Sequence, residues 1–358
     1  MKKIGIRALK IIIFIFGFCL IFLELQKVLH YHWVEKEDLY STNILLKTQP
    51  EDAYDVLFFG TSEIKTSVFP TEIYHETGVT SFNYALTNKS AMTTYYQLKY
   101  VLRYQNPKVV CCDFSALYED CLPSERETIY RKVVDTMPDY DLKWEMIKSI
   151  DEIEPEQSRL SYVFPMLRYH SIWNELTEVN FQEDYVYNEE HPGYGNGTAL
   201  VNGSFDGEPY DFIPEIWEAE PSDEQMSQIS VEWYDKFIKL CQDNDIRVVA
   251  LFPPALGFAY DQVARWDTTT AYLNSRGVDI IDYNNYDAVQ DIGLSVAEDY
   301  SDNTHMAYRG SLKVSRNLAH VLVDRYELQD HRGGPEDEKW TQQWNEFCSE
   351  YDVPVEYQ

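Results

Sequence analysis

The chain has 358 residues, and 44% of them are hydrophobic, which is enough to bury one large core. Its formal net charge of −30 argues against nucleic acid as a partner, because phosphate contacts need clustered Lys and Arg. The 28 Tyr and 8 Trp residues fit a carbohydrate-facing surface, although ordinary core packing explains aromatic residues more simply.

The N-terminus predicts a membrane anchor. Residues 1–10 are rich in Lys and Arg, and an uncharged apolar run follows from Ile11 to Leu23. This order predicts a cytoplasmic N-terminus and export of the remaining chain. No small-residue cleavage site follows, and Phe18 stands where a lipoprotein signal needs a small residue before Cys19. We therefore expect residues 1–28 to hold a cytoplasmic start and an uncleaved single transmembrane helix, with the catalytic domain extracytoplasmic, and a removed signal peptide stays open as the alternative.

Residues 29–54 are expected to form a stem and linker, after which strands and helices alternate. The predicted strands are 55–59, 80–84, 109–112, 247–252 and 278–282, and the predicted helices are 90–104, 222–243, 260–275 and 311–327. Ser222 is the expected cap of the second of these helices. Strands that alternate with helices at this spacing pair in parallel through right-handed crossovers. The predicted fold is α/β, a three-layer sandwich around a mainly parallel sheet of about five strands.

The domain of residues 55–328 is expected to contain an insertion at about 118–215. Residues 118–181 read as mainly helical, and residues 182–210 form a turn-dense loop that is either a substrate-facing lid or a solvated excursion. Residues 329–358 form an acidic tail with two Trp residues, which we expect to dock only loosely.

The six cysteines have neither a disulfide framework nor the spacing of a zinc site. Buried thiols are the simpler interpretation, and a disulfide at Cys121 stays open. The histidines lack convergent metal-ligand partners, so we expect no metal and no cofactor.

Two short motifs predict a catalytic site. Gly60-Thr61-Ser62 directly follows the strand 55–59, and Asp302 precedes His305 by three residues. A serine that leaves the end of a buried strand is exposed on a tight turn, and glycine lets the backbone bend there. His305 would act as general base and Asp302 would fix its tautomer, with Asp299 as an alternative orienter. Because ligands bind at the carboxyl ends of parallel strands, both motifs are expected at one edge of the sheet.

These motifs resemble those of the SGNH (GDSL-like) hydrolases, in particular the membrane-anchored cell-envelope branch related to DltD and to polysaccharide O-acetylation proteins. Residues 59–63 are similar to the first block of that family, which implies Ser62 as nucleophile. Residues 82–88 are similar to the second block, where Asn88 replaces a glycine whose N–H forms part of the oxyanion hole. Residues 302–305 with Gly310 and Lys313 resemble the last block. The resemblance covers about residues 55–325 without the insertion.

The third block of the family, Gly-x-Asn-Asp, is missing after the strand 109–112. Asp113 or Ser115 either fills its place or caps the strand end, and capping is the simpler interpretation. The predicted site comprises the catalytic residues Ser62, His305 and Asp302 and the oxyanion or substrate-binding residues Gly60, Asn83, Asn88 and Asp113.

The resemblance implies an extracytoplasmic serine esterase or O-acyltransferase that acts on an acylated cell-envelope glycopolymer, and it leaves a membrane acyltransferase open as a partner. The missing third block leaves a second hypothesis, a catalytically weak binding or assembly protein with the same fold. A peptidase stays open as a third, although nothing in the chain resembles a peptide-binding cleft.

Overall fold

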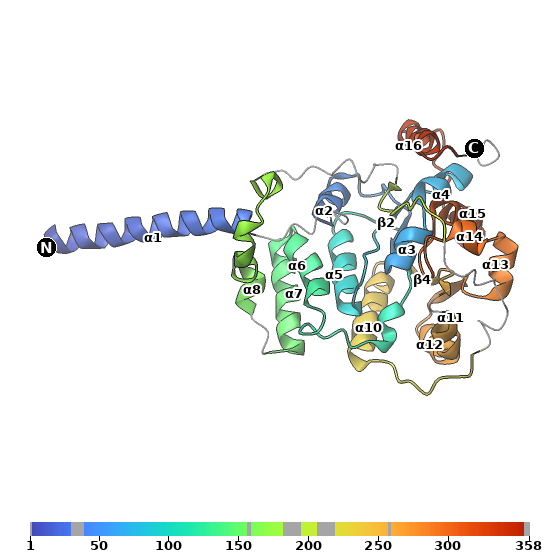
Figure 1. The fold of residues 1–358 in the computed structure, drawn as a ribbon, viewed down its shortest axis with the longest axis horizontal. Coiled ribbons are helices and arrows are strands. Elements are labelled where there is room, and N and C mark those ends of the chain that lie inside the picture. Colours follow the sequence, from blue (N-terminus) through green and yellow to red (C-terminus); the bar gives the residue numbers. More distant parts are fainter. Residues whose placement is uncertain are drawn as a thin grey trace. The chain divides into compact units, whose positions relative to one another are not determined.

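Five parallel strands form one sheet in the order β2-β1-β3-β4-β5 in the computed structural model (Figure 1). The strands are β1 (Val56–Phe59), β2 (Ser81–Asn83), β3 (Val109–Cys112), β4 (Arg247–Phe252) and β5 (Asp279–Asp282). The strands β1 and β3 are buried throughout, as continuous apolar runs in parallel sheets are, and the more polar β2 is buried as well. The predicted strand positions and parallel pairing are confirmed.

The structure describes residues 2–29, 39–155, 159–181, 195–205, 219–256 and 259–353. The chain divides into two units, Met1–Asn43 with Leu122–Asn188, and Ile44–Cys121 with Glu189–Gln358. The second unit contains the whole sheet. Each unit is described below by itself.

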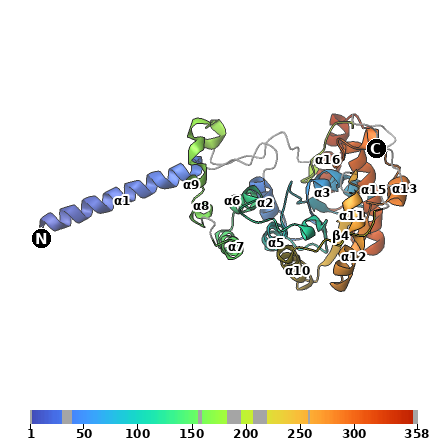
Figure 2. The ribbon, with the colours of Figure 1, turned by 60° about the horizontal axis from the view of Figure 1, so that its bottom comes forward.

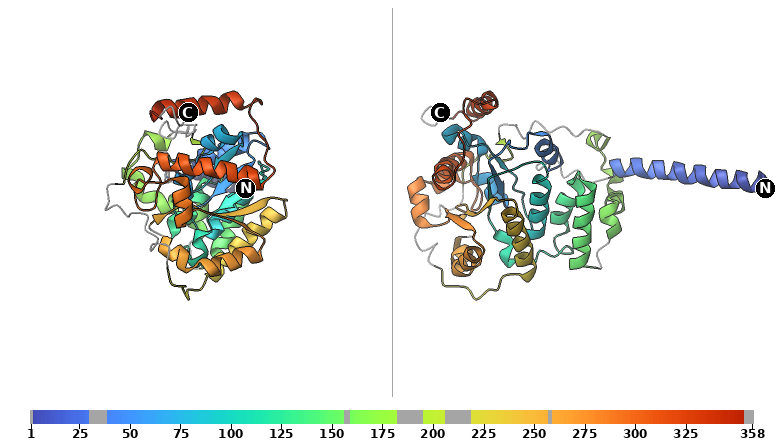
Figure 3. Two further views of the ribbon diagram at one scale, coloured as in Figure 1. Left: turned by 90° about the vertical axis from the view of Figure 1, so that its right-hand side faces the viewer. Right: turned by 180° about the vertical axis from the view of Figure 1, so that it is seen from behind.

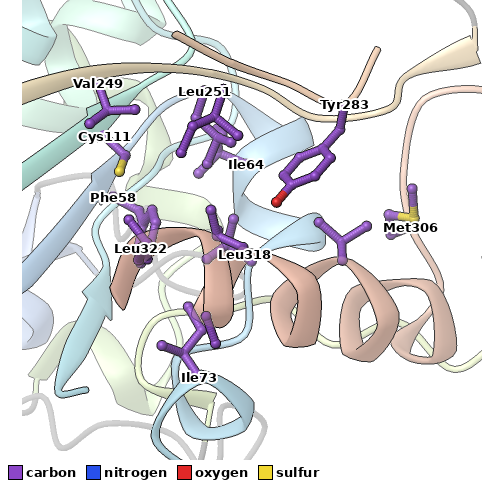
Figure 4. Close-up of a cluster of buried hydrophobic side chains, with 14 of the residues drawn as sticks. Phe58, Ile64, Ile73, Cys111, Val249, Leu251, Tyr283, Met306, Leu318 and Leu322 are labelled. Atoms are coloured by element: carbon purple, nitrogen blue, oxygen red, sulfur yellow. The ribbon is translucent and has the colours of Figure 1, made fainter. Parts of the chain in front are cut away.

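Helices cover both faces of the sheet, which confirms the three-layer α/β sandwich. On one face lie α3 (Ser62–Ser67), α4 (Pro70–Thr77) and α15 (Tyr308–Arg325), which pack against one another. Figure 4 shows the core on this face, where Phe58, Cys111 and Val249 of three neighbouring strands meet Leu318 and Leu322 of α15. On the other face lie α5 (Ala91–Val101) and α10 (Gln228–Gln242), which pack together (Figure 2).

The remaining helices of this unit follow the later strands. They are η1 (Ser115–Tyr118), α11 (Ala259–Ala264), α12 (Trp266–Ser275), α13 (Tyr286–Ile292), α14 (Val296–Asp299) and α16 (Asp337–Glu350). The predicted single helix 260–275 is therefore two helices, which meet at Arg265. The predicted helix 311–327 is α15, which begins three residues earlier.

The predicted start of α10 is wrong. The helix begins at Gln228, and its cap is Ser227, whose hydroxyl accepts a hydrogen bond from Ser230 N at 3.1 Å. Ser222 Oγ accepts only from Glu224 N at 3.2 Å in a non-helical segment. Glu224 is instead used in an ion pair with Arg265, so this segment follows a tertiary contact rather than its capping pattern.

The expectation of a loosely docked C-terminal tail is also wrong for its described part. The helix α16 lies against α4 (Figure 3). It buries Trp340, Trp344 and Phe347. Trp344 stacks on His75 with ring centroids 4.2 Å apart, and Phe347 meets Phe69 at 4.8 Å. The apolar residues of α16 recur on one face, so a helix with an acidic surface still contributes to the core.

The first unit is helical. It contains α1 (Lys2–Val28), α6 (Glu127–Thr136), α7 (Tyr140–Ile153), α8 (Arg159–Val163), α9 (Met166–Tyr169), η2 (His170–Asn174) and η3 (Glu178–Phe181), and α2 (Leu39–Thr48) spans the boundary between the units. The helical character predicted for residues 118–181 is confirmed where the structure describes them. Within α1, Ile6–Val28 is long and apolar enough to cross a membrane.

Candidate active site

Ser62 is the first residue of α3 and lies two residues beyond the end of β1. The turn before it is tight because Gly60 passes close to two neighbours. A Cβ at Gly60 would lie 2.6 Å from Ile64 Cβ and 2.9 Å from Asp113 Oδ2. The glycine is thus required by close approach and not by a left-handed backbone. The turn presents Ser62 at the carboxyl edge of the sheet, where the sequence motif predicted it.

Asp302 and His305 lie on one short loop before α15. The loop is closed by an antiparallel bridge between Tyr300 and Met306, and the buried Tyr300 hydroxyl donates to Pro254 O at 2.9 Å. Asp302 Oδ1 accepts hydrogen bonds from Thr304 N and His305 N, both at 2.8 Å. These bonds hold the carboxylate in one orientation and leave its other oxygen for the imidazole.

The three predicted catalytic side chains form one hydrogen-bonded chain. His305 Nε2 lies 2.7 Å from Ser62 Oγ, and His305 Nδ1 lies 2.7 Å from Asp302 Oδ2. Residues 243 positions apart are thereby in direct contact. Asp299, the alternative orienter, is buried and accepts instead from Lys313 Nζ at 2.7 Å and Ser295 N at 2.7 Å. The geometry is that of a serine with an adjacent base and a carboxylate that fixes the base.

Asp113 caps the strand end, as the simpler of the two interpretations predicted. Its Oδ2 accepts from Thr61 N at 2.6 Å, and its Oδ1 accepts from Ser115 N at 3.1 Å. The buried Lys89 ammonium lies 3.0 Å from the same Oδ1. Oδ2 therefore holds the turn before Ser62, while Oδ1 holds the start of η1 and pairs with the buried Lys89 charge.

The Asn83 side chain has a structural role next to the helix that carries Ser62. Its side chain is buried and donates to Ile64 O at 3.0 Å and Val68 O at 2.8 Å, which fastens α3 to the end of β2. Its Oδ1 accepts from Ala85 N at 3.2 Å. The side chain does not line the cavity described below, so the predicted contact with substrate is replaced by a structural role.

Asn88 adopts a left-handed backbone, with φ of 51°. Asparagine tolerates this region better than other residues that carry a side chain, and a glycine would adopt it freely. Among the described residues, neither the Asn88 N–H nor the Ser62 N–H has a hydrogen-bond acceptor. Both residues line the same cavity as the Ser62 side chain.

A cavity of about 640 Å³ opens beside Ser62 and His305. Away from the serine turn and the His305 loop, it is lined by residues 118 and 119, 224, 252 and 253, 261 and 262, 265 and 266, and 269. Arg265 stacks on Tyr118 with 4.6 Å between the guanidinium and the ring centroid, and it donates to Glu224 at 2.8 Å. Trp266 meets Phe252 edge to face at 5.4 Å. The wall therefore offers aromatic faces next to a charged pair.

Burial and neighbouring charges shift the pKa values of two carboxyl groups near Ser62, those of Glu63 and Asp113. Burial raises the pKa of Glu63 to about 7, and the nearby Asp113 charge adds to this rise. Burial alone would raise the pKa of Asp113, but the Lys89 ammonium and the Thr61 and Ser115 N–H groups outweigh it and lower the pKa. Asp113 is thus the charged carboxylate of the pair, and Glu63 titrates near neutral pH.

Several residues of the cavity were missed by sequence reasoning. Thr61 and Glu63 stand in the motif around Ser62 but were not assigned a role there. The others are Tyr118, Glu224, Arg265 and Trp266 of the cavity, and Lys89, which is buried beside Asp113. One signal was available for Lys89, because it is the only charged residue between Val79 and Tyr96. No local pattern marks the others, since they come from separate segments that only the fold brings together.

The turn-dense loop, for which the sequence leaves both a substrate-facing lid and a solvated excursion open, is described only in part. Within residues 195–205, Asn196 O accepts from Asn83 N at 2.9 Å and Gly197 has φ of +91°, so this part of the stretch lies beside β2, while Ala199 N donates to Lys65 O at 3.0 Å in α3. None of these eleven residues lines the cavity. Residues 182–194 and 206–215 of the predicted insertion lie outside the described residues.

Comparison with known proteins adds little to this description. No protein-family model matches the chain, and no curated protein matches it. Among solved structures, the chain is similar to a proposed acylhydrolase from Bacteroides fragilis, with 11% identity over 82% of this chain and 98% of the other. The TM-score of 0.34 is too low for the match to carry an argument about fold or function.

Proposed function

We propose that this protein is a serine esterase or O-acyltransferase of the SGNH type. The observation that carries the proposal is the chain of hydrogen bonds from Ser62 through His305 to Asp302, with 2.7 Å at each step. It stands in a cavity large enough for a small acyl ester next to a sugar. The Gly60-Thr61-Ser62 turn and the Asp302 to His305 loop also carry the resemblance to that family.

The reaction would proceed through an acyl-enzyme. Ser62 Oγ attacks the ester carbonyl carbon while its proton passes to His305 Nε2. The tetrahedral oxyanion accepts hydrogen bonds from the N–H groups of Ser62 and Asn88. Each donor of this kind stabilises the transition state by about 3 kcal/mol. When the C–O bond breaks, His305 returns the proton to the leaving alcohol oxygen. Water or a sugar hydroxyl then attacks the acyl carbon while His305 Nε2 takes its proton. When the bond between the acyl carbon and Ser62 Oγ breaks, His305 returns the proton to Ser62 Oγ and the free enzyme is restored.

Asp302 would position the imidazole. Its Oδ2 accepts the Nδ1–H of His305, which leaves the lone pair of Nε2 directed at the serine. Burial alone would raise the pKa of Asp302, but hydrogen bonds from His305 and from the Thr304 and His305 N–H groups lower it. The carboxylate therefore stays charged and stabilises the imidazolium that forms during attack.

The proposed substrate is an acylated glycopolymer of the cell envelope. Tyr118 and Trp266 offer flat rings on the cavity wall, and such rings pack on sugars and leave a polar edge. The span at Ile6–Val28 and the basic residues before it support a cytoplasmic N-terminus and a catalytic domain outside the membrane. A membrane acyltransferase that supplies the acyl group is part of this proposal for the transferase case.

The alternative is a catalytically weak protein that binds such a polymer. One observation favours it: the position after β3 holds Asp113, which accepts hydrogen bonds and offers the oxyanion no side-chain donor. The intact contact between Ser62 and His305 favours the enzyme.

Labelling with a fluorophosphonate probe tests the proposal. Full-length protein should be labelled, and Ser62→Ala and His305→Ala should each abolish labelling. Ser349→Ala, an exposed serine of α16, is the matched control and should label as wild type does. Hydrolysis of p-nitrophenyl acetate, measured by release of p-nitrophenol, should be lost in the same two variants and kept in wild type and in Ser349→Ala. A folded wild type that neither labels nor hydrolyses the ester would support the binding protein instead.

A further inference from the structure

A short segment of the helical unit wraps the end of the predicted membrane span. We call residues 159–181 the interfacial segment. It contains α8, α9, η2 and η3. Met166 N donates to Gln26 Oε1 at 2.6 Å, and Asn180 Nδ2 donates to Val28 O at 3.3 Å. Figure 1 shows this green segment crossing the end of α1.

One aromatic contact reaches the apolar run itself. Phe164 meets Phe22 edge to face, with ring centroids 5.4 Å apart. Phe22 is the penultimate residue of the uncharged run Ile11 to Leu23, so it marks the level at which the span leaves the hydrocarbon. The interfacial segment therefore starts at the depth of the lipid–water boundary.

The buried side of the segment is fixed to the rest of its unit. Tyr162 and Tyr169 are buried and stack on the Arg131 guanidinium at 4.2 and 5.5 Å. Arg131 also donates to Ser161 O at 3.0 Å, and the Tyr169 hydroxyl donates to Asp135 at 2.9 Å. The segment thus has a defined packing partner on one side.

Its other side exposes large apolar residues. Leu160 is 60% exposed, Leu167 46%, Trp173 70% and Phe181 64%. In α8 the exposed Leu160 stands two residues from the buried Tyr162, and in α9 the exposed Leu167 stands two residues from the buried Tyr169, so each short helix has an exposed apolar side opposite its buried side. Large apolar residues that gather on an exposed side mark a site of interaction with a protein or a membrane.

The charges of the segment favour an uncharged partner surface. Arg168 is paired with Glu127 at 3.1 Å, and Arg159 is paired with Asp151. The segment also carries the exposed Glu175 and Glu178, so with both arginines paired and a chain charge of −30 its attraction to anionic lipid is weak. Burial of apolar area at about 25 cal/mol per Å² is the remaining driving force, and it does not depend on salt.

We propose that the interfacial segment lies in the outer lipid–water interface around the exit of α1, with Leu160, Leu167, Trp173 and Phe181 in contact with lipid. Tryptophan is enriched at this depth because its ring is apolar and its N–H is polar. Amphipathic helices that lie in the interface bury their apolar side among the upper acyl chains. The inference rests on the proposed anchor and is independent of the chemistry at Ser62.

A spin label on the full chain in phosphatidylcholine nanodiscs tests this contact. Cys19→Ser removes the single exposed thiol, since the other five cysteines are buried, and Trp173→Cys then carries the label. The label should be more accessible to oxygen than to a water-soluble nickel complex. Lys239→Cys, whose native side chain is 73% exposed, is the aqueous reference and should show the opposite order. Phe181→Cys is the second position if Trp173→Cys does not fold.

Each outcome decides the proposal. Oxygen accessibility that is unchanged at high salt and with anionic lipid supports it. A label at position 173 with the accessibility of the Lys239 reference overturns it, and so does a label shielded from both reagents, which would indicate protein contact. Release of the chain from membranes by alkaline carbonate would overturn the anchor as well. Fluorophosphonate labelling of Ser62, measured on the same sample, reports separately on the proposed function.

Discussion

The Asp113 carboxylate accepts the backbone N–H of Thr61 at 2.6 Å and so fixes the residue immediately before Ser62. The same carboxylate lies 3.0 Å from the buried Lys89 ammonium, which is itself almost inaccessible to solvent. A structural ion pair thus stands directly behind the proposed nucleophile. Such a pair fixes geometry, and the loss of one partner leaves an uncompensated buried charge.

Asp113→Asn should therefore destabilise the protein by about 3 kcal/mol, because Lys89 loses its counter-ion while buried. Urea unfolding measures the change. The double variant Asp113→Asn with Lys89→Met removes the orphaned charge and should recover most of the loss. Equal stability of the single and double variants would contradict a buried ion pair at this place.

Gly60→Ala should lower both stability and labelling of Ser62. The new Cβ would lie within 3 Å of Ile64 Cβ and Asp113 Oδ2, so the turn must shift, at a cost of about 1–3 kcal/mol. Thermal unfolding and fluorophosphonate labelling measure the two effects. Gly203→Ala is the matched control, because its nearest neighbour would be 3.8 Å away. Wild-type labelling by Gly60→Ala would show that the turn tolerates the shift.

Asp302→Asn should reduce ester hydrolysis by about 10³- to 10⁴-fold with little change in fold, since an amide no longer fixes the productive tautomer of His305. Asp243→Asn, at an exposed ion pair, should keep the full rate. Burial alone would raise the pKa of Asp302, but hydrogen bonds lower it. The charged carboxylate therefore stabilises the folded state at pH values above its unfolded pKa, and this stabilisation is lost as pH falls through the folded pKa. The stability advantage of wild type over Asp302→Asn should accordingly shrink below about pH 4, as urea unfolding at several pH values would show.

Glu63 provides a second test by pH. Burial, with a smaller contribution from Asp113, raises its pKa to about 7, so the folded state holds a proton that the unfolded state releases near pH 4. Stability should fall as pH rises between these two values, by roughly 2–3 kcal/mol. Glu63→Gln cannot titrate and should lose this part of the pH dependence. Parallel stability curves for the two proteins from pH 5 to 8 would exclude a raised pKa.

Trp344→Ala tests the docking of the C-terminal helix. The side chain is 5% exposed and stacks on His75 of α4, so its removal should cost about 3–5 kcal/mol. Gln342→Ala, on the exposed side of α16, should stay within about 0.5 kcal/mol of wild type in the same urea titration. A small effect of Trp344→Ala on stability would contradict tight packing of α16 on α4. It would support the loosely docked tail that the acidic composition suggests.

Local patterns in the chain predicted the sheet well. Apolar runs of four to six residues bounded by turns mark buried parallel strands, and the alternation with helices requires crossovers of one hand. The same reasoning placed Ser62 and the pair Asp302 and His305 at the carboxyl edge of the sheet. The start of α10 and the docking of α16 were missed, because an ion pair at Glu224 and stacking on His75 act over long separations in the chain.

The amino-acid sequence by itself determined the candidate nucleophile, its base and the positions of the strands along the chain. Each of these depends on residues that are close together in the chain. Only the tertiary structure decided the partners. Asp302 contacts His305, whereas Asp299 pairs with Lys313. The Asn83 side chain donates to the backbone of α3. Asp113 accepts from Thr61 N and pairs with Lys89. Hydrogen bonds and ion pairs depend on distances of about 3 Å, and those distances arise only when separate segments pack together.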